Sequence, residues 1–235
     1  MILSDEILSA SERSALRLRA LFHDHGYRRF PMSHFEPYDL YAANRAFLAS
    51  DDIISFTGSA GKLLALRPDV TLSVVKSMKS AQTGLERVYY HENVYRRSGL
   101  GREFRESAQV GAECYGELSD DVMGEVTTLA VLSLKTLEAK TCLDVSHMGF
   151  IAAIMDELLL PSGVRGEFFA RLSEKNAPGL SCLADKYSIS TAGADLLSRL
   201  AALYGTLPQI SEELNRLVVN DAAEAAAQEL RALVS

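Results

Sequence analysis

Residues 87–117 read RVYYHENVYRRSGLGREFRESAQVGAECYGE, and this stretch carries the most informative pattern in the chain. The first half, Val88 to Tyr95, is rich in aromatic and β-branched residues and predicts a strand, and Ser107 to Tyr115 predicts a second one. Between them lies a short polar loop of Arg96, Arg97, Ser98, Gly99, Leu100, Gly101 and Arg102. The pattern therefore predicts a β-hairpin with a basic tip.

Polar side chains of the second strand are expected to share one face. Gln109 and Glu113 are four residues apart, and strand side chains alternate, so both point to the same side. Arginines near the loop offer forked donors to phosphate or carboxylate. An amide, a carboxylate and a guanidinium together suit the ammonium and carboxylate groups of an amino acid. The alternative is an ordinary exposed polar face of an antiparallel sheet.

Two sequence blocks carry a family resemblance. The run R-x-x-x-Q-x-G-x-E-x-x-G, which is Arg105, Gln109, Gly111, Glu113 and Gly116, resembles motif 2 of class II aminoacyl-tRNA synthetases in its histidyl form. Upstream, residues 66–71 read LRPDVT and resemble the L-R-P-D/E-x-T element of the same family, which supplies an acid and a hydroxyl to a histidine pocket. Two blocks in the expected order are a specific signal.

The resemblance implies an α+β fold, in which helices flank an antiparallel sheet of the class II synthetase type. A core-type region is expected over residues 1–146, and a helical region packed on it over 147–235. The helix at Ile7 to His25 and the strand at Tyr27 to Met32 would form motif 1, which builds the dimer interface in the family. Ser33 stands where the family has a proline, and Glu36 is kept.

The remaining elements follow from periodicity and turn residues. Strands are expected at Asp52 to Phe56, Lys62 to Leu66 and Cys142 to Val145, and helices at Asp69 to Met78 and from the cap Ser119 to about Lys140. Further helices are expected at Gly149 to Leu160, Val164 to Ser173, Ala177 to Lys186, Thr191 to Tyr204 and Asp221 to Val234. The segment Gly205 to Pro208 has the composition of a turn.

The R-G-L-D-Y-Y element, motif 3 and the anticodon-binding domain of the synthetases do not occur in this sequence. Without the motif 3 arginine, much of the electrostatic grip on ATP phosphates is missing, so no catalytic residue is expected. A sheet without those strands has an open edge. The chain thus resembles the regulatory subunits of ATP phosphoribosyltransferase, a family paralogous to histidyl-tRNA synthetase, in a C-terminally short form.

That resemblance implies a non-catalytic regulator in histidine biosynthesis, with histidine as its ligand. Its expected partners are a short-form ATP phosphoribosyltransferase catalytic subunit and, through the motif 1 region, a second copy. The residues implied are Asp69, Thr71, Gln109 and Glu113 for histidine and Arg96 and Arg105 for an anion. Simpler roles stay open: Thr71 as a helix cap, Gln109 in a cross-strand contact, and Glu113 paired with Arg105.

Two other functions are compatible with the same residues. One is a histidyl-tRNA synthetase-like fragment that binds or activates an amino acid. The other is a degenerate paralogue that only dimerises.

Composition narrows the class of protein. With 235 residues, 48% hydrophobic and 23% charged, the chain is typical of a globular protein, and a net charge of −7 argues against tRNA binding. No apolar run long enough for a membrane span and no secretory signal occur, so we expect a cytoplasmic protein without a membrane partner. Cys114, Cys142 and Cys182 are expected as buried thiols, and neither a metal site nor a cofactor is expected.

Overall fold

The computed structural model describes residues 7–45, 48, 53–78, 84–97, 103–137 and 140–234. The predicted hairpin loop at residues 98–102 and the expected strand residue Asp52 lie outside this part. The chain divides into two compact units, residues 1–141 and 142–235. The first unit contains α1 (Ala10–Asp24), β1 (Arg28–Arg29), β2 (Phe35–Pro37), α2 (Tyr38–Ala42), β3 (Ser55–Thr57), η3 (Ser59–Gly61), β4 (Leu63–Leu66), α3 (Thr71–Met78), β5 (Glu86–Arg97), β6 (Phe104–Tyr115) and α4 (Asp120–Thr136).

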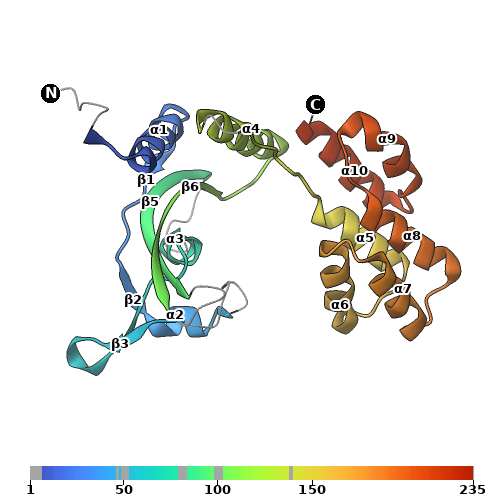
Figure 1. The fold of residues 1–235 in the computed structure, drawn as a ribbon, viewed down its shortest axis with the longest axis horizontal. Coiled ribbons are helices and arrows are strands. Elements are labelled where there is room, and N and C mark those ends of the chain that lie inside the picture. Colours follow the sequence, from blue (N-terminus) through green and yellow to red (C-terminus); the bar gives the residue numbers. More distant parts are fainter. Residues whose placement is uncertain are drawn as a thin grey trace. The chain divides into compact units, whose positions relative to one another are not determined.

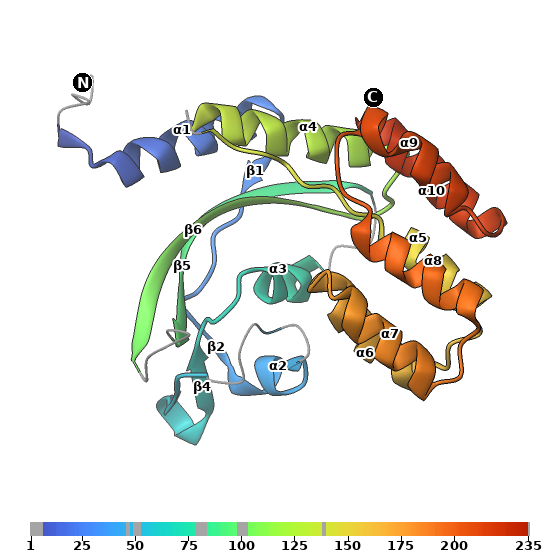
Figure 2. The same ribbon diagram turned by 45° about the vertical axis from the view of Figure 1, so that its right-hand side comes forward.

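The long hairpin of β5 and β6 confirms the central prediction. The two strands pair antiparallel from Glu86 with Tyr115 to Arg97 with Phe104, and β1 pairs parallel with β5, which gives the strand order β1-β5-β6. Arg96 and Arg97 belong to β5 and not to the loop, so the predicted strand was too short at this end. Figure 2 shows the hairpin as one strongly curved ribbon.

Helices cover both faces of this hairpin (Figures 1 and 2). On one face, α1 and α4 contribute Phe22 and Leu129, which pack with Tyr89 of β5. On the other face, Val74 of α3 packs with Val88 and Val94 of β5, and both of these β5 side chains are fully buried. Glu113 lies opposite Val88 in the register, so it projects toward α3.

The ends of two helices follow the sequence signals. Ser9 and Glu12 form a reciprocal capping box at the start of α1, and Gly26 beyond its end has φ of 81°. Ser119 caps α4 by accepting from the Val122 N–H. Both predicted helices are confirmed, although each is shorter than expected.

A small second sheet has the order β2-β4-β3 and is antiparallel throughout. The predicted strands near residues 55 and 64 are confirmed, and Gly61 in the connection has φ of 72°, which a glycine adopts without strain. On the buried side, Ala65 packs with Tyr41 and Leu72. β4 ends at Leu66 and α3 begins at Thr71, so the position of this sheet fixes the position where α3 begins.

The second unit is helical over its described residues. It contains α5 (Met148–Glu157), α6 (Ser162–Ser173), α7 (Ala177–Lys186), α8 (Thr191–Ala202), α9 (Leu207–Arg216) and α10 (Asp221–Val234). Phe150 and Ile154 of α5 pack against a buried face of α10 that is made of small side chains, including Ala223 and Ala227. None of the helices in the described ranges is long and apolar enough to cross a membrane.

Three predictions for this region were wrong. Helix α9 was not predicted, and it begins at Leu207 within the segment read as a turn, because Thr206 is bonded to Gln209 and Pro208 fits the first turn of a helix. No strand forms at Cys142 to Val145, where Asp144 instead accepts a hydrogen bond from the Tyr204 hydroxyl. Cys142 and Cys182 are exposed and Cys114 is half-buried, so the thiols are not all buried as expected.

Candidate functional site

A hydrogen bond between α3 and β6 forms the centre of the candidate site. Thr71, the first residue of α3, donates from Oγ1 to Oε1 of Glu113 at 2.7 Å. The second carboxylate oxygen, Oε2, is buried and accepts no hydrogen bond from the residues that the structure describes. A buried carboxylate oxygen without a partner is costly, and a ligand that donates a hydrogen bond would relieve that cost.

Asp69 and Arg96 extend the site away from Glu113. Asp69 Oδ1 accepts from the Leu72 N–H at 3.0 Å and so caps α3, while its Oδ2 lies 3.5 Å from Arg96 Nη2. Arg96 also donates from Nε to the carbonyl oxygen of Pro68 at 2.7 Å. Asp69 therefore caps this helix, which was the simpler role considered for Thr71. The Thr71 hydroxyl instead points to Glu113.

The electrostatics of the site are set by burial. Burial raises the pKa of the Glu113 carboxyl above its usual value of 4.5, and nearby Asp69 raises it further. The hydrogen bond from Thr71 acts in the opposite direction. The pKa of Tyr90 is also raised, chiefly by burial and then by the charges of Glu113 and Asp69. These shifts place Tyr90, Glu113 and Asp69 in one electrostatic group, which is a common property of binding sites.

Tyr90 reaches this group because residue 111 is a glycine. Tyr90 and Gly111 are opposite each other in the register of β5 and β6. A Cβ atom added at Gly111 would lie 2.5 Å from the Tyr90 hydroxyl oxygen and 2.6 Å from its Cζ. The tyrosine side chain therefore crosses over β6 at a point where only glycine leaves room. The sequence reasoning missed Tyr90; the glycine two residues before Glu113 was the available signal.

Gln109 and Arg105 lie farther along the same face of β6. Gln109 is opposite Glu92 and Arg105 is opposite Arg96. Neither side chain has a hydrogen bond or ion pair in the described part of the chain, and Arg105 is exposed. The structure thus brings together Asp69, Thr71, Glu113 and Arg96 and leaves the other two predicted residues outside this cluster. The alternative pairing of Glu113 with Arg105 does not form.

Arg67 fixes the position of the segment that carries Asp69. Its side chain is fully buried, with 0% exposure, and its guanidinium donates to the carbonyl oxygens of Ser33 and Asn93 and to the Glu92 carboxylate. The Arg67 carbonyl oxygen also accepts a hydrogen bond from the Tyr95 N–H of β5. This arginine was missed as a positioning residue, although its place in the LRPDVT run was visible.

An apolar cleft adjoins the Thr71 and Glu113 pair. It has a volume of about 490 Å³ and runs along β6 toward α4. Its walls are Thr71, Ala112, Glu113, Cys114, Tyr115, Leu118, Val122, Met123, Val126 and Thr127. β6 is the edge strand of its sheet in the described structure, so the expected open edge lies beside this cleft. The arrangement offers one carboxylate in otherwise apolar surroundings, which suits a small ligand with a donor group.

Among the described residues, no group of three His, Cys, Asp or Glu side chains is placed to hold a metal ion.

Comparison with known proteins identifies the family. A family model described as histidyl-tRNA synthetase matches residues 4–235. The chain belongs to the histidyl-tRNA synthetase family. Within this family, curated relatives are named ATP phosphoribosyltransferase regulatory subunit, as the resemblance predicted. One from Oceanobacillus iheyensis is 26% identical over 203 residues, which are 85% of this chain and 50% of the relative. The chain thus spans about half the length of that relative.

Solved structures of the family share the fold. A structure from Bacillus halodurans, described as an ATP phosphoribosyltransferase regulatory subunit/histidyl-tRNA synthetase, has a TM-score of 0.81 at 23% identity and covers 95% of this chain and 59% of its own. An ATP phosphoribosyl transferase (HisG:HisZ) complex from Thermotoga maritima has a TM-score of 0.66 at 17% identity, over 94% of this chain and 75% of that one. The predicted class II synthetase-like α+β fold is confirmed.

Proposed function

We propose that this chain acts as a regulatory subunit of ATP phosphoribosyltransferase, which binds histidine and controls a short-form catalytic subunit without catalysing the reaction itself. The names of its curated relatives support the assignment to this system. The chain spans about half of those relatives, and the site that supports this function lies within that half.

The unpartnered oxygen of Glu113 is the observation that carries the proposal. Oε1 is already bound by Thr71, so a ligand meets Oε2 as a buried acceptor. The ammonium group of histidine is a donor with a positive charge, and each charge-assisted hydrogen bond contributes about 1.5–3 kcal/mol. Asp69 adds a second negative charge near the same group, and Thr71 keeps the Glu113 carboxylate oriented.

Arg96 would meet the carboxylate end of the ligand. Its guanidinium is about one-third exposed and is joined to Asp69 at 3.5 Å, which is a long ion pair that a better-placed anion can replace. Gln109 and Arg105 have no partners of their own in the described structure and lie on the same face. We propose that they act at the outer end of the site, with Gln109 toward the ligand and Arg105 toward an anion.

Regulation requires that histidine binds two states of the assembly with different affinity. The proposed assembly contains the catalytic subunit and a second copy of this chain. Exposed aromatic residues near the motif 1 region support self-association, since Phe35 and Phe56 stack edge to face at 5.4 Å and are 51% and 37% exposed. With a net charge of −7, tRNA is not proposed as a partner, and a cytoplasmic location follows from the biosynthetic role.

The test measures phosphoribosyl-ATP formation by a short-form catalytic subunit, with and without this chain, at zero and saturating histidine. We expect the rate to rise when the chain is added and to fall with histidine. Glu113→Gln should make the rate insensitive to histidine, whereas Glu117→Gln, the same chemical change at an exposed position, should leave the response intact. An unchanged rate and no co-elution of the two proteins would contradict the proposal.

A second candidate function is a histidyl-tRNA synthetase-like fragment that binds or activates an amino acid. The family model itself, described as histidyl-tRNA synthetase, favours it. Histidine-dependent exchange of pyrophosphate into ATP distinguishes the two functions. Exchange above background would favour the fragment, and its absence together with a histidine-sensitive phosphoribosyltransferase rate would favour the regulatory subunit.

A further inference from the structure

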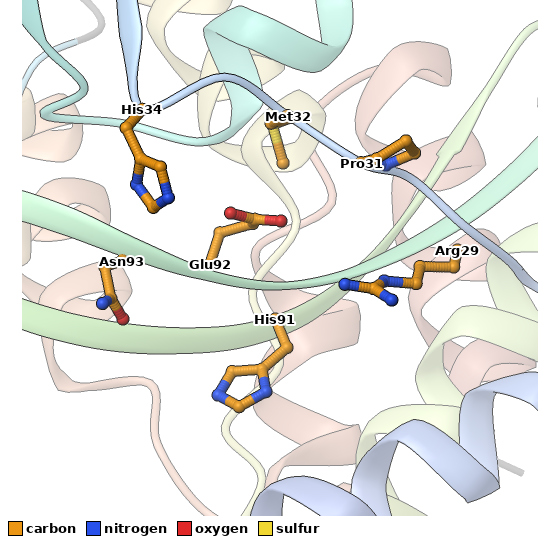
Figure 3. Close-up of a pocket in the computed structure, with 7 residues that line it drawn as sticks. All are labelled: Arg29, Pro31, Met32, His34, His91, Glu92 and Asn93. Carbon is orange, nitrogen blue, oxygen red and sulfur yellow. The ribbon is translucent and has the colours of Figure 1, made fainter.

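A second cavity lies on the other side of the hairpin from the β6 edge, between β5 and the segment that leads from β1 to β2. Its volume is about 540 Å³, and its walls are Arg29, Pro31, Met32, His34, His91, Glu92 and Asn93 (Figure 3). This size is sufficient for a small-molecule ligand. None of the residues predicted for histidine or for an anion lines it.

The cavity exists because the segment is attached to β5 at two points with a gap between them. The Phe30 N–H donates to the Tyr89 carbonyl at 2.9 Å, and the Ser33 carbonyl accepts from Arg67 Nη1 at 2.8 Å. Between these points stands Pro31, which has no N–H to offer. The buried Arg67 also binds Asn93 of β5, so both walls are held in place before any ligand arrives.

Backbone donors of β5 face this gap. Alternate residues of a strand direct their peptide groups to the same edge, and Tyr89 and Asn93 use their carbonyl oxygens at this edge. The peptide groups of His91 lie between them and therefore point into the gap, while Figure 3 shows its imidazole on the opposite side of β5 from His34. Within the described part of the chain, no residue pairs with the His91 N–H at this edge.

The charge of the cavity is positive. Glu92 is the carboxylate in its walls, and Arg67 neutralises it through an ion pair of 2.9 Å in which the arginine is fully buried. Arg29, by contrast, forms no hydrogen bond or ion pair with the residues that the structure describes, and its guanidinium points toward β5 in Figure 3. The His34 ring lies 6.5 Å from the ring of Phe35, centroid to centroid, and faces Glu92 across the gap.

We propose that this cavity binds a small oxyanion, phosphate- or carboxylate-bearing, between the Arg29 guanidinium, the His34 imidazole and the His91 peptide N–H. The guanidinium supplies a forked pair of donors and the peptide supplies a fixed one, which together match the geometry of an oxyanion. Arg67 is a positioning residue that holds the walls. The site is independent of histidine binding and of the Arg96 region.

The first experiment is a titration of the full chain with inorganic pyrophosphate, followed by NMR of the His34 imidazole and of the His91 peptide N–H and by calorimetry. We expect saturable binding of one anion with movement of the His34 and His91 resonances. Arg29→Ala should weaken binding about tenfold or more, as the loss of one charge-assisted contact predicts. Arg28→Ala is the matched control, because its neighbouring guanidinium is already paired with Glu86, and it should change affinity less than about twofold.

A second variant and a second anion extend the experiment. His34→Gln replaces an exposed side chain and should also weaken binding, so the result does not depend on one variant. Citrate in place of pyrophosphate distinguishes carboxylate from phosphate recognition. The proposal is wrong if no saturable binding occurs, if Arg28→Ala weakens binding as much as Arg29→Ala, or if the shifted resonances exclude both histidines.

Discussion

Thr71 Oγ1 lies 2.7 Å from Glu113 Oε1, and this bond joins two residues that are 42 positions apart in the chain. It connects the first residue of α3 with the second strand of the hairpin and leaves the other oxygen of Glu113 buried without a partner. The chain therefore keeps a carboxylate in a position where its ionised form is unfavourable. Such an arrangement is typical of a site that is completed by a ligand.

Glu113→Gln should stabilise the protein at neutral pH while it removes the proposed histidine binding. The pKa of Glu113 is raised by burial, so between the usual value of 4.5 and the raised value the folded state binds more protons than the unfolded state. Wild-type stability therefore falls as pH rises through this window and stays lower above it. Glutamine stays neutral and avoids this loss. Urea denaturation from pH 4 to pH 8 measures the difference.

The stability gained by Glu113→Gln should disappear near pH 4, where the wild-type carboxyl is also neutral. Glu117→Gln should be neutral throughout, because its side chain is exposed. A wild-type protein that is as stable as the variant at pH 7 would show that the buried carboxylate is not under strain.

Glu125→Gln should have the opposite effect on stability. Two hydrogen bonds of 2.8 and 2.7 Å from Arg87 bind the Glu125 carboxylate and join β5 to α4. Arg87 lowers the pKa of Glu125, so stability from this pair is present above pH 4.5 and is lost as pH falls through the lowered value. The variant should be less stable than wild type at pH 7, and the difference should shrink on acidification. Thermal unfolding of both proteins at pH 7 and at acidic pH tests this. A stability difference that is the same at both pH values would contradict it.

Two glycine substitutions should change stability with opposite signs. Gly111→Ala places a Cβ 2.5 Å from the Tyr90 hydroxyl, so the ring must move, at a cost of about 1–3 kcal/mol, and the proposed histidine binding should weaken with it. Gly124→Ala in α4 meets no atom within 4 Å and should stabilise the helix by about 0.5–1 kcal/mol. Urea denaturation of both variants provides the comparison, and equal effects would refute the close packing of Tyr90 on Gly111.

Replacement of Arg67 should be among the most damaging changes in the first unit. Arg67→Met leaves Glu92, which is 11% exposed, without its partner and frees two backbone carbonyls, at a cost of about 3–5 kcal/mol. Arg28→Met breaks an ion pair in which Arg28 is 57% exposed, and should cost less than about 1 kcal/mol. Denaturation midpoints should separate the two clearly. Adding Glu92→Gln to Arg67→Met should recover part of the loss, and a strictly additive double variant would exclude coupling between the two residues.

Local patterns predicted most of the elements because their causes are local. The aromatic and β-branched residues of β5, the caps Ser9 and Ser119 and the glycine after α1 act within a few residues of themselves. The errors came where local signals compete. Gly205 and Pro208 are typical of a turn, yet the same segment holds a cap and the first turn of α9.

The sequence by itself determined the hairpin and the helical second half, since periodicity is a property of neighbouring residues, and its resemblance to a known family named Asp69, Thr71 and Glu113 as candidates. Only the tertiary structure decided which of the six predicted site residues meet. It brought Arg96 to Asp69, left Arg105 exposed opposite Arg96 without a bond to the cluster, and revealed Tyr90 and Arg67. The physical reason is that register, curvature and burial arise from packing between distant segments, and these fix both the reach of a side chain and the cost of its charge.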